Sequence, residues 1–230
     1  MLMQLTSDQK KQVDRRLRDL FEFYWLKVKE IVAAAERYDK EQRMVITSAI
    51  ELRAAFDHVA RVHGALSGIE AVQWQDAALS LYDYCEKNLS KAHGHLYRAA
   101  YDAYDIIAFA LTEKLEKCLE AVSSMTLHTV VPDAMERVVI PFQNALKLVT
   151  QAKVRKDVNG REAERMEFEQ YEEAVNGLLD ARDYIDPRLS ELMRHERQQR
   201  RQDRRRTLIT IAGWVVGAVA TIGATIMTVF

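Results

Sequence analysis

The sequence predicts an all-α protein, in which a cytosolic helical bundle continues through a long C-terminal helix into one transmembrane helix. The 230 residues include only 8 glycines and 3 prolines, so turns are few and the elements between them are long. Apolar residues recur at steps of three and four over most of the chain, which is the period of a helix that buries one face. The last stretch, Thr207–Phe230, contains no charged residue.

Two helices are predicted before Gly68. The first covers about Ser7–Asp39 and the second about Lys40–Leu66, and Ser67-Gly68 ends the second because glycine readily adopts turn conformations. Each has one apolar stripe, which we expect to face the core. The stripes consist of Leu17, Leu20, Phe21, Tyr24, Val28, Ile31, Ala35 and Tyr38 in the first helix, and of Val45, Ala49, Leu52, Phe56, Val59 and Leu66 in the second.

Two further helices are expected to follow, one over about Ile69–Ser90 and one over about Lys91–Val122. Short links between successive helices favour antiparallel neighbours, and therefore a bundle. His63, on the apolar stripe of the preceding helix, is expected to be a core residue. The fourth helix carries a heptad-like row of Tyr97, Tyr101, Tyr104, Ala108, Leu111, Leu115 and Cys118.

Prolines help to delimit the last helices. A fifth helix is expected to begin near Pro132, because proline is tolerated in a first turn, and Pro141 is expected to kink it. A sixth helix begins at Arg161 and has a heptad-like seam typical of a coiled coil or a bundle edge. At Asp186-Pro187 the helix is expected to restart, with the aspartate as its cap.

These elements suggest three segments. Residues 1–158 form the helical bundle, and residues 159–206 form a charged helical stalk with an arginine-rich neck. Residues 207–230 form the transmembrane helix. Cys85 and Cys118 are 33 positions apart and lie outside any CxxC motif, so we expect two reduced, buried thiols.

The last 24 residues are the basis for the predicted localisation. A helix of this length rises about 36 Å, enough to cross a hydrocarbon core of about 30 Å. Arginines next to a membrane span stay on the cytoplasmic side, so we expect a single-pass protein of the bacterial inner membrane with a cytoplasmic N-terminal body. The lipid-facing basic neck is expected to be Arg200, Arg201, Arg204, Arg205 and Arg206, with an RNA-binding arginine tract as the alternative.

Charge is distributed unevenly along the chain. The segment from Arg194 to Arg206 contains seven arginines and two acidic residues, which gives a local charge of +5. Because the net charge of the whole chain is −1, the rest of the chain carries −6. An acidic body argues against a general nucleic-acid-binding protein. Within the predicted span, a GxxxG pair and two further small residues on the same helix face favour close helix pairing, and hence a homo-oligomer. These residues are Gly213, Gly217, Thr221 and Ala224.

Catalytic signatures are few. The sequence has no glycine-rich phosphate loop, no GxSxG and no HExxH, so it predicts no cofactor and no metal site.

Arg53 and His58, in ELRAAFDH, have the spacing R-x4-H. On a straight helix the two side chains project about 140° apart, so a joint site needs a second chain or a bent helix. The alternative is structural, with Arg53 paired to Asp57 and His58 beside Glu51.

At this motif the predicted bundle, over about residues 7–122, resembles HEPN-like helical proteins, including membrane-anchored members of bacterial antiviral defence. The resemblance implies metal-independent RNA cleavage, with His58 as the acid/base and Arg53 as the phosphate partner. Ala54 departs from the pattern, which prefers a polar residue directly after the arginine.

A second polar stretch, HGHLYRAAYDAYD, places four side chains on one helix face. These are His95, Arg98, Asp102 and Asp105, and we interpret them, together with Glu51 and Asp57, as a polar network that joins the second and fourth helices. On this helix face only His95, Asp102 and Asp105 are metal-ligand types, and three are too few to favour a metal site.

The favoured function is therefore non-enzymatic. We expect a tail-anchored protein that homo-oligomerises and acts as an antiviral defence effector or accessory by perturbing the membrane. Two alternatives stay open: a tethered HEPN-type endoribonuclease, for which RNA is the partner, and a scaffold that docks a soluble protein partner at the bilayer.

Overall fold

The computed structural model describes residues 5–39, 45–69, 79–155 and 161–229, and in this part of the chain all regular structure is helical. For residues 45, 152–155, 161–167, 213 and 215–229 only the backbone is described. The helices are α1 (Ser7–Phe23), α2 (Lys29–Tyr38), α3 (Val45–Leu66), α4 (Leu81–Glu120), α5 (Ser124–Val130), α6 (Ile140–Arg155), α7 (Arg161–Ile185) and α8 (Leu189–Val229). Wider π-helical turns, Tyr24–Val28 and Met135–Val139, precede α2 and α6, and a 3-10 turn, Asp186–Arg188, precedes α8.

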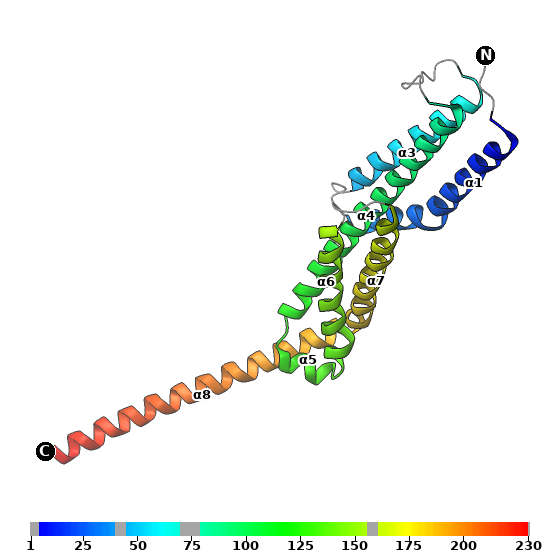
Figure 1. Cartoon of the computed structure of the whole chain (residues 1–230). Coiled ribbons are helices and arrows are strands. Elements are labelled where there is room, and N and C mark those ends of the chain that lie inside the picture. The colour runs from blue at the N-terminus through cyan, green and yellow to red at the C-terminus, as the bar shows by residue number, and fades with distance from the viewer. Residues whose placement is uncertain (1–4, 40–44, 70–78, 156–160, 230) are drawn as a thin grey trace. The chain divides into compact units, whose positions relative to one another are not determined.

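Contacts divide the chain into two compact units. Unit 1 comprises Met1–Glu113 and Phe142–Leu179, and unit 2 comprises Lys114–Pro141 and Asp180–Phe230. In unit 1, α1 and α3 both run along the first half of α4 (Figure 1).

The first predicted helix is present as a continuous helical rod from Ser7 to Tyr38, interrupted only by the π-helical turn. A capping box starts it: Thr6 Oγ1 accepts from the backbone N–H of Gln9, and the Gln9 side chain accepts from the backbone N–H of Thr6. Of the predicted stripe, Leu20 and Val28 are buried, whereas Phe21 is exposed.

The predicted third and fourth helices are wrong in one respect, because no boundary separates Ser90 from Lys91. Both residues lie inside α4, a single helix of 40 residues. No proline or turn-forming glycine interrupts this region, so the backbone hydrogen bonds continue through it. Its start is fixed by Ser80, whose Oγ accepts from the backbone N–H of Asp83 at 3.1 Å and donates to the Asp83 carboxylate at 2.5 Å.

The core of unit 1 is built along α4, where alanines allow close approach of the helices. Around Phe168 of α7, aromatic rings from α1 and α4 gather at centroid distances of 5.5–5.8 Å. His63 is exposed, so its expected place in the core is wrong; its neighbour Val62 is buried instead. The buried residues of α4 include Leu89, Ala92, Leu96, Ala99, Ala100, Ala103, Ile106, Ile107 and Leu111.

Unit 2 contains α5, which the sequence prediction missed. Ser123 caps it, and both the backbone N–H and the hydroxyl of Ser123 donate to the Glu196 carboxylate of α8 at 2.9 Å. These contacts attach α5 to α8. Asp186 was expected to cap the following helix, but its side chain does not do so. Instead, its carboxylate accepts a hydrogen bond from Lys114 Nζ at 2.5 Å.

Near Pro141 the expected kink takes the form of the π-helical turn Met135–Val139, which ends two residues before the proline. Proline has no backbone N–H, so the regular ladder is already interrupted there. The two cysteines are confirmed as buried thiols: both are free, and burial raises the pKa of Cys85 to about 11.

The predicted transmembrane helix is contradicted, and with it the tail-anchored inner-membrane localisation. In the described part of the chain, no helix combines enough length with enough apolar character to cross a membrane. Of this apolar run, side chains are described only for residues 207–212 and 214. The predicted pairing residues Gly213, Gly217, Thr221 and Ala224 lie outside the described side chains.

Candidate functional site: a paired-histidine pocket

Unit 1 contains a cavity of about 820 Å³ lined by residues of α1, α3 and α4. Its lining is rich in imidazoles and cations. We call it the paired-histidine pocket, because His58 of α3 and His95 of α4 both border it. Its lining residues are Arg16, Asp19, Leu20, His58, Lys87, Leu89, Ser90, Lys91, His93, Gly94, His95, Tyr97 and Arg98.

His58 is held by Asn88, a buried residue of α4. The Asn88 Nδ2 group donates to the carbonyl oxygen of Tyr84 at 2.9 Å, which leaves its Oδ1 as the acceptor. His58 Nδ1 lies 2.9 Å from that Oδ1, so Nδ1 must carry the proton. The second ring nitrogen, Nε2, is therefore the one that keeps a lone pair in the neutral ring. The geometry assigns His58 the tautomer of a proton acceptor.

His95 is held by Glu51 and Arg98. Its Nδ1 lies 2.6 Å from Glu51 Oε2 and 2.7 Å from Arg98 Nη2, while Arg98 Nε donates to the same Glu51 oxygen at 2.9 Å. Burial favours the neutral form of Glu51, but the hydrogen bonds from His95 and Arg98 outweigh it and lower the pKa of this carboxyl. Glu51 is thus an anion that connects α3 to α4 and orients the His95 ring through Nδ1.

The two imidazoles are stacked, with ring centroids 5.3 Å apart and planes inclined by 23°. In each ring, Nδ1 is hydrogen-bonded to a residue of the other helix: that of His58 to Asn88 of α4, and that of His95 to Glu51 of α3. Within the described part of the chain, neither Nε2 atom has a hydrogen-bond partner. Two adjacent, oriented imidazoles with one available nitrogen each are suited to moving protons.

Burial lowers the pKa of His58, and the charges of His95, Arg61 and Lys91 lower it further, against the opposing effect of the Asn88 hydrogen bond. His58 is therefore neutral at pH 7. A neutral imidazole with a free lone pair is the form that accepts a proton.

Cations outnumber acids at the pocket lining. Arg16 pairs with Glu86 at 3.3 Å and donates to Ser90 Oγ at 3.2 Å, so it is fixed at the wall. Lys91 has no ion pair among the residues that the structure describes. With Lys87 and Arg98 the lining carries four permanent cations, against the single acid Asp19. Such a lining favours an anionic ligand.

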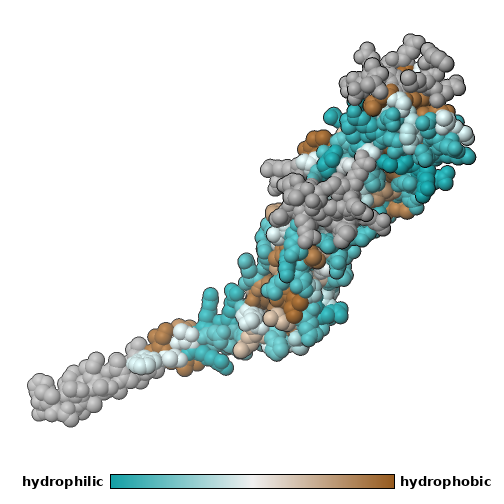
Figure 2. All heavy atoms as spheres, in the orientation of Figure 1, coloured by the Kyte–Doolittle hydropathy of each residue, from teal (hydrophilic) through white to brown (hydrophobic). Residues whose placement is uncertain are grey.

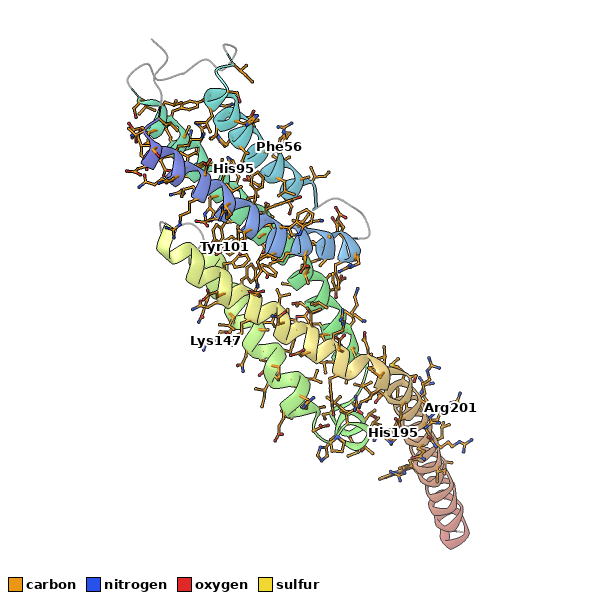
Figure 3. All side chains as sticks on the ribbon, turned by 90° about the vertical axis from the view of Figure 1, so that its right-hand side faces the viewer. Phe56, His95, Tyr101, Lys147, His195 and Arg201 are labelled. Atoms are coloured by element: carbon orange, nitrogen blue, oxygen red, sulfur yellow. The ribbon has the colours of Figure 1, made fainter. Side chains whose placement is uncertain are left out.

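Arg53 does not join His58. It borders a different cavity, an apolar groove of about 930 Å³ between α1 and α3, as the opposed directions on one straight helix require. The structural alternative for Arg53 is also wrong, because Asp57 pairs with Arg61 at 2.7 Å. Figure 3 shows Phe56, another groove residue, and His95 on α3 and α4.

The two α4 aspartates of the predicted polar network, Asp102 and Asp105, lie away from the paired-histidine pocket. Asp105 accepts a hydrogen bond from the hydroxyl of Tyr171, and Asp102 also acts on that tyrosine, whose pKa is raised by burial and by the Asp105 hydrogen bond. Of the six predicted network residues, the structure therefore brings only Glu51, His95 and Arg98 together. In the described residues, no three histidine, cysteine or acidic side chains converge as metal ligands.

The sequence analysis missed Asn88, Arg16 and Lys91. Asn88 is an isolated amide within a helix, and only its proximity to His58 reveals its role. Its separation of seven residues from His95 places both on one face of α4, which is the signal that could have found it.

The predicted neck arginines lie on α8 in unit 2, and all five are exposed. Arg200 alone among them pairs with Glu196, at 2.7 Å. No protein-family model, no curated protein and no solved structure matches this chain.

Proposed function

We propose that the protein binds RNA in the paired-histidine pocket and cleaves its phosphodiester bonds by general acid–base catalysis. The carrying observation is the stacked pair His58–His95, in which each Nδ1 is engaged and each Nε2 is available. The cationic lining supports an anionic substrate. Arg53, which the HEPN resemblance assigns to phosphate binding, has no part in this arrangement.

The reaction that fits this pair is transesterification. Nε2 of His58 accepts the proton of a ribose 2′-hydroxyl, and the 2′-oxygen forms a bond to the adjacent phosphorus. The bond from phosphorus to the 5′-oxygen breaks, and this oxygen takes the Nε2 proton of His95, which acts as a doubly protonated ring whose Nδ1–H donates to Glu51. The products are a 2′,3′-cyclic phosphate and a 5′-hydroxyl, and no further reactant is required. Such proton transfers contribute about 10²–10⁴-fold to a rate.

Lysine and arginine side chains of the lining would bind the non-bridging phosphate oxygens, where negative charge grows in the transition state. By the resemblance to HEPN-like proteins, bacterial antiviral defence is the biological setting that we propose for this activity.

The test uses the purified full chain and a fluorescently labelled single-stranded RNA in EDTA. We expect cleavage to fall at least about 100-fold in His58→Ala and in His95→Ala. The matched control is His63→Ala, which removes an exposed imidazole from the same helix as His58 and should cleave normally. Products should end in a cyclic phosphate. Equal cleavage by His58→Ala and the parent chain would refute the proposal.

A second candidate function, self-assembly, is favoured by the apolar groove between α1 and α3. Phe21, Trp25 and Phe56 border it, and each exposes more than half of its surface. At about 150–250 Å² per aromatic side chain, the three expose on the order of 350 Å² of apolar area. That is close to half of what one partner contributes to a standard interface of about 800 Å².

The occupant that we propose is a second copy of this chain. The groove border carries Arg18, Arg53 and Glu22, so charges of both signs lie on one face and two copies can pair reciprocally. Phe56→Asp should reduce the assembled mass measured by sedimentation. The control Phe109→Asp places the same charge on another phenylalanine, on α4, that is also more than half exposed, and should leave the mass unchanged. Equal masses for both variants would refute this role of the groove.

A further inference from the structure

A second basic surface lies in unit 2, on α8. Three arginines at positions i, i+3 and i+7, namely Arg194, Arg197 and Arg201, border a hollow of about 600 Å³. Figure 3 shows Arg201 projecting outward from the helix, and Figure 2 shows this part of α8 as hydrophilic. We call these three residues the arginine face. The hollow is completed by Ser190, Met193 and Gln198.

The arginine face carries unneutralised charge. Within the part of the chain that the structure describes, none of its three guanidinium groups forms an ion pair. At about 100° per residue, the two acidic residues of this segment, Glu196 and Asp203, project from the opposite side of α8. Glu196 is also already engaged by Ser123 and Arg200. The positive charge of this face is therefore available to an external anion.

The spacing of the arginines suits an extended anion. Arg204 and Arg205 continue the row on the same side of the helix, and from Arg194 to Arg205 the helix rises about 16 Å. Every cationic residue from Arg161 onward is arginine, without one lysine. The planar guanidinium binds phosphate oxygens in pairs and stacks on bases, so arginine suits nucleic acid better than lysine does.

Composition distinguishes a nucleic acid from a protein partner. The segment Arg194–Arg206 contains no apolar side chain. Protein interfaces need a buried apolar centre, and the hollow offers only Met193 for one, whereas a phosphate backbone is bound by charge alone.

We propose that the arginine face binds the phosphates of single-stranded RNA. This inference rests on the proposed function in one respect, because that function makes RNA the substrate; it adds a binding surface in unit 2 that is separate from the chemistry. RNA is held here by its backbone, without reading its sequence.

The test measures the binding of a fluorescein-labelled 12-nucleotide RNA to the full chain at salt concentrations from about 0.05 to about 1 M NaCl. Over about this range, the release of counterions from RNA makes the binding constant depend measurably on salt. In the triple variant Arg194→Gln, Arg197→Gln, Arg201→Gln, loss of three phosphate contacts should reduce the slope of log K against log salt by about 2. Affinity should fall about 100-fold at 0.1 M salt and converge with the parent chain near 1 M. Circular dichroism verifies that the helices are retained.

The matched control removes three exposed cations of unit 1, as Lys10→Gln, Arg15→Gln and Arg37→Gln, and should change the affinity less than about threefold, within ordinary surface-charge effects. An unchanged slope in the arginine-face variant would overturn the inference. So would binding of polyglutamate as tight as that of RNA. His58→Ala separates the two proposals: it should bind RNA with the parental slope, and if it still cleaves, the proposed function fails while the arginine face stands.

Discussion

Replacing Asn88 by alanine tests the most specific contact of the paired-histidine pocket. Asn88 is 6% exposed, and its amide joins His58 Nδ1 to the carbonyl oxygen of Tyr84. The variant leaves the Nδ1–H group of a half-buried ring without its acceptor, which costs about 1–3 kcal/mol of unfolding free energy. The Tyr84 carbonyl is less affected, because it belongs to the helical ladder of α4.

Helix propensity acts in the opposite direction, since alanine is favoured over asparagine within helices by about 0.5–0.7 kcal/mol. Asn176→Ala is therefore the control, because Asn176 is an exposed residue of α7 in the same unit. We expect urea unfolding, followed by circular dichroism, to show Asn88→Ala less stable than Asn176→Ala by about 1–3 kcal/mol. A difference below about 0.5 kcal/mol would show that this hydrogen bond does not hold His58.

The same variant has a consequence for titration. The Asn88 hydrogen bond raises the pKa of His58 against the effects of burial and neighbouring charges. Its removal should therefore lower this pKa further, as an NMR titration of the His58 ring would show. An increase in the pKa of His58 would contradict the assigned hydrogen bond.

Three further predictions concern the wall and core of unit 1. The folded-state pKa of Glu51 is lowered, so the ion pairing of Glu51 stabilises the fold above about pH 4.5, and this stabilisation is lost as the pH falls through the folded pKa. In acid unfolding curves, the difference in unfolding free energy between the parent chain and Glu51→Gln should therefore shrink as the pH falls. A difference that grows towards low pH would contradict the pairing. Phe168→Ala should lower the unfolding free energy by about 3–5 kcal/mol in urea, because its ring is 5% exposed and contacts four other aromatic rings; a loss below about 1 kcal/mol would contradict this packing. Cys85 should not react with a disulfide reagent at pH 8 until the protein unfolds, because burial raises its pKa to about 11, and a rapid reaction of the native thiol would contradict its burial.

Periodicity was sufficient to predict the helical class and the approximate course of the first helices, because one buried face requires apolar residues at helical spacing. It placed a break between Ser90 and Lys91, whereas both residues lie inside one long helix. It also missed α5, a helix of only seven residues that depends on contacts of Ser123 with Glu196, 73 positions away. Short helices depend mostly on tertiary contacts.

The candidate site was predictable only in part. Glu51 and His58 stood out on one stretch of sequence and His95 and Arg98 on another, but the stacking of His58 on His95 depends on the rotational setting of α3 against α4. The R-x4-H spacing suggested Arg53 as a partner, although residues five apart on a helix diverge. The predicted span relied on a long, charge-free and uniformly apolar run, whereas no helix in the described part of the chain is both long and apolar enough to cross a membrane.

The wider turn Tyr24–Val28 has a consequence for how this protein can change by insertion and deletion. Four buried residues of the first rod, Val13, Leu20, Val28 and Ala35, are separated by seven, eight and seven positions. The wider π-helical turn accommodates the extra position between Leu20 and Val28. The buried residues before and after the turn therefore stay on the same face of the rod, although the sequence between them is one residue longer. Removing one residue there would restore an unbroken seven-residue repeat with the same inward positions. The same removal two turns earlier would rotate every later side chain by about 100° away from its neighbours.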